Sequence, residues 1–289
     1  MKKAILFFLP VIFMLYAFTG DKPAYQLYSH KGKKVKFKEL KKASLEADII
    51  LFGELHNDPI CHWLQLELTK TLYEELGNNL LLGAEMFETD NQLILGEYLN
   101  GKISTRSFKS EARLWLNYDT DYEALVEFAR DSSLTFIATN IPRRYASVVH
   151  KQGLEALDSL SLAAKRYLPP LPIKYDPELK GYKDMLGMMG GMGGHTNENL
   201  PKAQAIKDAT MAYNILKNWY PQKVFLHYNG TYHSNNREGI VWYLEQEKPG
   251  INILTIATVK QSEIDELEEE NQNLADFIIC IPENMTTTH

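Results

Sequence analysis

Six short apolar runs, spaced along the chain between longer helical patterns, constrain the fold more than any other feature. They lie at residues 48–52, 80–84, 135–139, 223–228, 251–257 and 276–281. Uninterrupted runs of this length are typical of strands that are buried on both faces, as in parallel sheets covered by helices. Strand, crossover helix and strand is the repeating unit of that architecture. The pattern therefore predicts an α/β fold with a mostly parallel central sheet flanked by helices.

The segment after the first run has the start and stop signals of a crossover helix. Asp58 is a capping residue, Pro59 suits the first helical position, and Gly77 suits the position just past the end. The apolar residues between these signals recur at helical spacing, which predicts one buried stripe. They are Ile60, Trp63, Leu64, Leu68, Leu72 and Leu76.

Residues 1–20 have the layout of a secretory signal peptide. Lys2 and Lys3 precede an apolar stretch at 4–18, which is short for a membrane span, and small residues follow it. We expect residues 21–289 to form a single α/β domain. The expected location is outside the cytoplasm, either periplasmic or associated with the envelope, without the cysteine that anchors a lipoprotein.

The charge balance argues against one class of partner. The formal net charge is −6, and it is −8 without Lys2 and Lys3 (−6 − 2), so nucleic acid is not expected. A run of lysines is the exception to this acidic balance, and it predicts a solvated hairpin and helix face, with peripheral membrane association as the alternative. The run consists of Lys31, Lys33, Lys34, Lys36, Lys38, Lys41 and Lys42.

Charged or imidazole side chains follow four of the predicted strands at the point where each strand ends. Glu54 and His56 follow the first run, and Glu85 follows the second. Arg143 lies just after the third run, and His233 lies just after the fourth. Loops at the carboxyl ends of parallel strands share one rim of the sheet, and ligands bind there. We therefore expect these side chains to form one site.

The chemistry of this set allows more than one interpretation. Glu54, His56, Glu85 and His233 could hold a divalent metal through nitrogen and oxygen ligands, with a position left open for water or substrate. Arg143 could then stabilise an oxyanion. The alternative is a structural network, in which Glu54 caps backbone N–H groups and Arg143 pairs with Glu85.

A long insertion at about residues 142–220 separates the third and fourth strands. It is predicted to be mostly helical, with a proline-rich break at 168–172, and to form a helical cap. Residues 185–195 contain four of the nine methionines and five glycines, and they end at His195. We expect this segment to be too flexible for a regular helix or strand. It is either a plain loop or a cover of mobile thioethers over a ligand of His195.

At these motifs the chain resembles the ChaN-like haem-binding uptake family of the Tiki superfamily. The matching segments are GELH at 53–56, AEMF at 84–87, NIPR at 140–143, KDATMA at 207–212 and GTYH at 230–233. The resemblance implies an exported α/β protein of haem or iron uptake with a helical subdomain. It also implies haem held at a homodimer interface through a tyrosine oxygen. Tyr182 and Tyr232 lie nearest to the motifs and, with His195, are the expected cofactor-binding residues.

The wider superfamily implies a second function for the same rim. It includes proteins that look like metal-dependent peptidases and esterases, with Glu, His, Glu and His at the positions of Glu54, His56, Glu85 and His233. Two hypotheses follow: an exported protein that binds haem, or a metal-dependent hydrolase that acts on a small molecule or peptide. The acid and base groups of the rim favour the hydrolase. The apolar cap and the closer resemblance favour haem.

Overall fold

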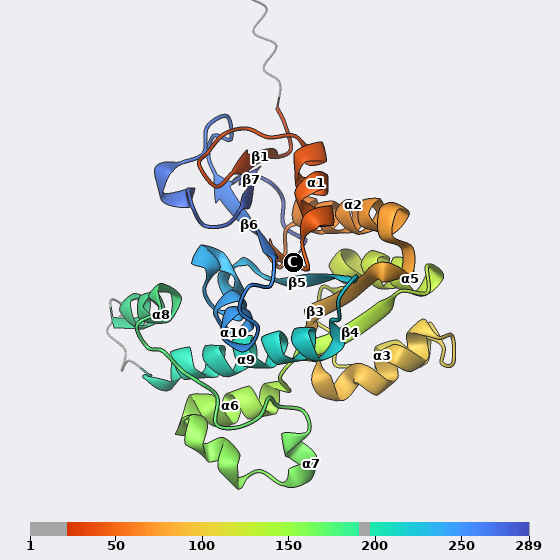
Figure 1. Cartoon of the computed structure of the whole chain (residues 1–289), viewed down its shortest axis with the longest axis vertical. Coiled ribbons are helices and arrows are strands. Elements are labelled where there is room, and N and C mark those ends of the chain that lie inside the picture. The colour runs from red at the N-terminus through yellow and green to blue at the C-terminus, as the bar shows by residue number, and fades with distance from the viewer. Residues whose placement is uncertain (1–21, 191–196, 289) are drawn as a thin grey trace, which may run out of the picture.

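A seven-stranded sheet forms the centre of the computed structural model, which describes residues 22–190 and 197–288 (Figure 1). The strand order is β1-β7-β6-β2-β5-β3-β4, with β1 antiparallel to β7 and the other neighbouring pairs parallel. The strands are β1 (Gln26–Ser29), β2 (Ile49–Glu54), β3 (Leu80–Glu88), β4 (Thr135–Asn140), β5 (Val224–Gly230), β6 (Ile253–Gln261) and β7 (Phe277–Pro282). The predicted fold class is confirmed. The edge strand β1 was not predicted, because its four residues lack an apolar run.

Two layers of helices cover the sheet, and the strand side chains alternate between them. Ile50 and Phe52 pack on the side of α2, α3 and α5, whereas Ile49 and Leu51 pack on the side of α9 and α10. The helices are α1 (Phe37–Glu46), α2 (Pro59–Leu76), α3 (Gln92–Leu99), α4 (Thr105–Glu111), α5 (Glu123–Asp131), α6 (Arg143–Gln152), α7 (Leu162–Lys165), α8 (Lys180–Gly190), α9 (Asn199–Asn218) and α10 (Ile240–Glu247). Burial on both faces explains why the strands read as continuous apolar runs.

Helix α2 begins and ends where the sequence signals place it. The Asp58 carboxylate accepts the N–H groups of Ile60 (3.0 Å) and Cys61 (3.2 Å), and Gly77 follows the last turn. Leu64, Leu68 and Leu72 of the predicted stripe are fully buried. Trp63 is largely exposed, so the buried stripe is narrower than predicted.

The helical insertion packs partly on itself and partly on the sheet. The first half of α9 packs through Ile206 against α6 and the segment before it, and the second half packs through Met211 and Ile215 against the sheet (Figure 1). Helix α8 contains residues 185–190, so the expectation of no regular structure was wrong there. Methionine is a good helix former, and this offsets part of the cost of the glycines. The rest of that run, with His195, lies outside the described residues.

Of the two amino-terminal features that the sequence predicts, the structure describes the lysine-rich segment but not the signal peptide. The predicted signal peptide at 1–20 lies outside the described residues. In the ranges that the structure describes, no helix combines the length and the apolar character that crossing a membrane requires. The lysines of 31–42 lie on a turn and on α1, where Lys34 pairs with Asp265 (3.1 Å) and Lys41 with Glu75 (2.7 Å). These contacts agree with the solvated face expected there.

The substitution Gly53→Ala tests how closely the strands pack at the start of the GELH motif. A Cβ atom at Gly53 would lie 2.7 Å from the Ile256 carbonyl oxygen and 2.8 Å from Thr231 Cα, both of them backbone atoms. We expect the free energy of unfolding, measured by urea titration, to fall by about 1–3 kcal/mol. Gly96→Ala in α3 is the control, because its Cβ would meet no atom within 4 Å. Equal stability of the two variants would contradict this packing.

Candidate functional site

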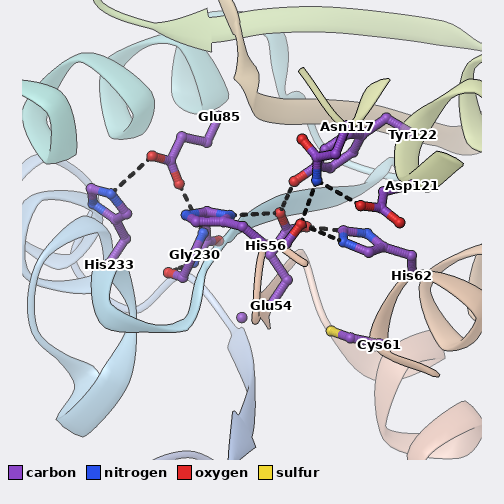
Figure 2. A network of polar contacts seen from close by, with 12 residues as sticks. Glu54, His56, Cys61, His62, Glu85, Asn117, Asp121, Tyr122, Gly230 and His233 are labelled. Carbon is purple, nitrogen blue, oxygen red and sulfur yellow. Dashed lines mark hydrogen bonds and ion pairs between the residues drawn. The ribbon is translucent and has the colours of Figure 1, made fainter. Parts of the chain in front are cut away.

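The predicted rim residues come together because their strands are neighbours. Strands β2, β5, β3 and β4 lie side by side and parallel, so their carboxyl ends share one edge of the sheet. Glu54 and Gly230 end β2 and β5 as partners in register. Glu85 lies near the end of β3, and His56 and His233 lie just past β2 and β5. Figure 2 shows these side chains as two units, Glu54 with His56 and Glu85 with His233, and Gly230 lies between them.

The first unit consists of Glu54 and the side chains that bind it. Glu54 is buried, and its Oε1 atom lies 2.9 Å from His56 Nδ1 and accepts a hydrogen bond from the Tyr122 hydroxyl at 2.5 Å. Its Oε2 atom accepts from the Gln65 amide at 2.5 Å. Burial alone would raise the pKa of Glu54, but the hydrogen bond with His56 and the nearby imidazoles lower it. The result is an ionised carboxylate that orients the His56 ring.

The second unit is a chain of buried groups that links β3 to the helical insertion. Glu85 Oε1 lies 3.1 Å from His233 Nε2, and His233 Nδ1 binds the Asp208 carboxylate of α9. Asp208 in turn accepts the Tyr182 hydroxyl of α8 at 2.8 Å. Burial would lower the pKa of His233, but the charges of Glu85 and Asp208 raise it to about 10. His233 is therefore the positive charge that keeps buried Glu85 ionised.

Gly230 joins the two units. Its N–H donates to Glu85 Oε2 at 2.8 Å, and a Cβ atom at this position would lie 2.9 Å from His56 Cε1 and Nε2. Only a glycine lets the ring approach the backbone so closely. Burial lowers the pKa of His56, and the hydrogen bond with Glu54 and the charge of Glu85 raise it above its ordinary value. This gives an imidazole between two carboxylates, suited to proton transfer.

A cleft of about 740 Å³ lies over this pair of units. His56 and Glu85 line it together with Arg143, Lys207 and Trp115. Arg143 is exposed and does not pair with Glu85, whose partner is His233, so the predicted Arg143–Glu85 contact is absent. The Trp115 ring packs edge-on against the His56 ring, with 4.8 Å between centroids. An acid and base pair therefore faces a space large enough for a small ligand.

The predicted metal ligands converge, but their arrangement does not fit a metal site. Across residues 22–190 and 197–288, no group of three or more His, Cys, Asp or Glu side chains could hold a metal ion. The donor atoms of Glu54, His56, Glu85 and His233 are directed at one another and at Gly230, Gln65 and Asp208. The four residues make pairs of carboxylate and imidazole in place of an open coordination shell.

The expected haem ligands lie apart from the acid and base pair or are engaged elsewhere. Tyr182 is 3% exposed and donates to Asp208, and burial followed by the Asp208 charge raises its pKa, which disfavours tyrosinate. Tyr232 is partly exposed and donates to the Gly181 carbonyl, and burial raises its pKa to about 12. His195 lies outside the described residues. His227 of β5 is fully buried and bound to Thr139, so it does not reach the cleft.

Asp208 and Tyr122 are site residues that were not predicted. Asp208 lies in the KDATMA segment, on the same face of α9 as Ala205 and Ala212, and a lone carboxylate on such an apolar face is a signal that could have been found. Tyr122 gave no comparable signal. It reaches Glu54 from a short helical turn (Tyr118–Tyr122) that the sequence pattern does not connect to the rim.

Comparison with known proteins now identifies the family. The model of the family described as haem-binding uptake, Tiki superfamily, ChaN matches residues 40–244, which is most of the chain and includes Glu54, Glu85, Asp208 and His233. The chain belongs to this family. The resemblance stated from its motifs is therefore confirmed.

Solved structures support the same fold. The ChaN protein of Campylobacter jejuni, whose structure is described as showing cofacial haem binding, superposes with a TM-score of 0.67 at 18% identity, over 88% of this chain and 96% of that one. A succinoglycan biosynthesis protein superposes with a TM-score of 0.52 at 13% identity, over 90% and 94% of the two chains. At these identities the likeness concerns the fold alone.

A curated relative matches a shorter part of the chain. The chloroplastic protein RETICULATA-RELATED 5 of Arabidopsis thaliana is 28% identical over 132 residues, which cover 44% of this chain. The match spans 18% of the length of that relative.

The charge of His233 can be measured directly. Its pKa of about 10 in the folded state lies above the ordinary value of 6.5, so its contribution to stability is complete below about pH 6.5 and is lost as the pH rises towards 10. Burial lowers the pKa of His227 to about 4. In an NMR titration we expect the His233 ring to stay charged through neutral pH and the His227 ring to stay neutral. Titration of His233 near pH 6.5 would contradict the buried ion pairs, and His233→Gln assigns its signals.

Proposed function

We propose that this protein binds haem in an aromatic groove beside α9, and that it serves haem or iron uptake outside the cytoplasm. The groove has a volume of about 610 Å³ and lies between α9, α10 and the segment 169–174. Prolines, aromatic rings and aliphatic side chains line most of it, as a flat apolar ligand requires. Its apolar and aromatic lining comes from Pro169, Pro170, Pro172, Ile173, Ala209, Ala212, Tyr213, Leu216, Trp219, Tyr220, Pro221 and Tyr243.

Two tyrosines of the groove are suited to bind ferric iron. Tyr220 is 53% exposed and Tyr213 is half-buried, and neither hydroxyl has a hydrogen-bond partner in the part of the chain that the structure describes. A phenol oxygen without a partner can ionise and ligate iron without losing a contact. By contrast, the hydroxyls of Tyr182, Tyr232 and Tyr243 already donate to Asp208, Gly181 and Lys174. This difference between free and engaged hydroxyls is the observation that carries the proposal.

The edge of the groove offers positive charge for the haem propionates. Lys174, Lys217 and Lys248 line it, and all three are exposed. The Lys217 ammonium lies 5.7 Å from the centroid of the Tyr213 ring, and the Lys248 ammonium lies 5.2 Å from that of Trp219. The iron of the bound group supplies redox and ligand-binding chemistry, and the protein supplies the ligand oxygen, the apolar wall and these cations.

A homodimer is part of this proposal. An open groove covers one face of a flat ring, so a second copy of the chain, with its own haem, would cover the other. The cofacial haem binding described for the Campylobacter protein supports such an arrangement.

A hemin titration tests the proposed site. We expect saturable binding with a tyrosinate absorption spectrum, and at least a tenfold loss of affinity, or about 1.4 kcal/mol, in the double variant Tyr213→Phe/Tyr220→Phe. Tyr232→Phe and Tyr182→Phe are the matched controls, because their hydroxyls are engaged in the protein. Loss of the spectrum in either control, with no change in the double variant, would move the site to those tyrosines.

The acid and base pair favours a second candidate function, hydrolysis in the cleft over His56. Glu54 fixes the His56 ring through Nδ1, so Nε2 can take a proton from water while the carboxylate stabilises the imidazolium. Two such pairs, Glu54 with His56 and Glu85 with His233, each place one member, His56 and Glu85, on the wall of the same cleft. No metal is needed in this scheme, in contrast to the metal-dependent hydrolase expected from the sequence.

The second candidate predicts that turnover of activated esters or peptides depends on His56. We expect His56→Gln to lower kcat about 100-fold or more, which is the usual contribution of a general base. Because the acid and base groups act without a metal, a chelator should leave the rate unchanged. The double variant Tyr213→Phe/Tyr220→Phe is the control, since both residues line the other groove. A rate that survives His56→Gln, or that disappears with the chelator, would exclude this scheme.

A further inference from the structure

The cleft over His56 and Glu85 holds two cations that the protein itself does not neutralise. Arg143 and Lys207 line it from α6 and α9. In residues 22–190 and 197–288, neither side chain forms an ion pair or a hydrogen bond. The next residue, Arg144, shows the contrast: its guanidinium binds Asp90 at 2.6 Å. Both free cations therefore remain available to a ligand.

The carboxylates of the cleft are already compensated. Glu85 is paired with His233 at 3.1 Å, and Glu88 is paired with Arg113 at 2.8 Å. Neither acid needs Arg143 or Lys207, so the positive charge of the two side chains is surplus in the cleft. Guanidinium and ammonium groups placed in this way recognise carboxylate or phosphate oxygens.

Asn140, which lines the same cleft, has a buried polar atom without a partner in the described ranges. Asn140, at the end of β4, is 8% exposed and donates through Nδ2 to the Glu85 carbonyl at 3.0 Å. Its Oδ1 atom is buried and accepts no hydrogen bond from any described residue. An unsatisfied acceptor of this kind indicates a missing donor, such as the hydroxyl or N–H of a ligand.

Part of the cleft wall is apolar. The segment 114–116 supplies Leu114, Trp115 and Leu116, and Leu116 is 89% exposed. A large apolar side chain so open to water on the wall of a concave site suits contact with an apolar part of a ligand.

From these features we propose that the cleft binds a small organic anion. Arg143 and Lys207 hold its carboxylate or phosphate, Asn140 Oδ1 accepts from a hydroxyl or N–H of the ligand, and the 114–116 wall covers its apolar part. This goes beyond haem binding. The anion site shares its cleft with the second candidate function. Its proposal does not depend on hydrolysis, because binding requires no turnover.

Binding of three matched aromatic probes tests this site. Phenyl phosphate, benzoate and neutral benzyl alcohol are titrated by calorimetry into the wild-type chain and into Arg143→Gln/Lys207→Gln. We expect at least one anion to bind tenfold or more tightly than benzyl alcohol, with an affinity that falls as salt rises. The double variant should lose that tenfold advantage. Whichever of phenyl phosphate and benzoate binds more tightly shows whether the site prefers phosphate or carboxylate.

The control is Arg144→Gln, which removes a cation of the same helix that is already bound to Asp90. It should bind the anion as the wild type does. Equal binding of anion and alcohol, or an unchanged affinity in the Arg143→Gln/Lys207→Gln variant with its fold intact by circular dichroism, would overturn the proposal. Turnover separates the two ideas: anion binding by a wild-type chain that hydrolyses no activated ester or peptide would leave this site standing and remove the hydrolase.

Discussion

Glu85 carries a negative charge away from water, and the structure around it depends on how that charge is compensated. The compensation comes from His233, from the Gly230 N–H and from the nearby His56. His233 in turn binds Asp208 of α9, which binds Tyr182 of α8, so one chain of contacts ties the sheet to the helical insertion. Breaking such a chain at one member leaves a buried charge without a partner, at a cost of several kcal/mol. The cluster therefore stabilises the packing of the insertion on the sheet and also places an ionised carboxylate, Glu85, at the cleft.

Much of the fold, and the location of the rim site, could be predicted from the sequence. Buried parallel strands have a direct signature in apolar runs, and the ends of α2 have one in Asp58, Pro59 and Gly77. Polar residues that follow each run must meet if those strands are neighbours, and Glu54, His56, Glu85 and His233 do meet. The apolar runs, the helix signals and the polar residues at strand ends are each set by a few consecutive residues, so they can be recognised in the sequence.

The rest required three-dimensional information. Whether four ligand-type residues bind a metal or one another depends on the direction of their side chains, and here they bind one another. A tyrosine suited to ligate iron is one whose hydroxyl is free, and sequence proximity to a motif pointed instead to Tyr182 and Tyr232, whose hydroxyls are engaged. The aromatic groove combines segments 169–174, 209–221 and 243–248, which carry no shared motif.

Helix α9 contributes side chains to both of the proposed ligand sites. Lys207 lines the cleft of the acid and base pair, Asp208 is buried behind it, and Tyr213 lines the aromatic groove. One helix therefore presents an anion-binding side chain to one ligand site and a phenol to the other. The two sites have different proposed ligands, so occupation of one should leave the other open.

NMR with gallium protoporphyrin, a diamagnetic analogue of ferric haem, tests this account most directly. Addition of the analogue to the isotope-labelled chain should shift the signals of Tyr213, Tyr220 and Trp219, and should leave the ring signals of His56 and His233 at their original positions. Shifts centred on the His56 and His233 rings, with the groove residues unchanged, would contradict the placement of haem beside α9.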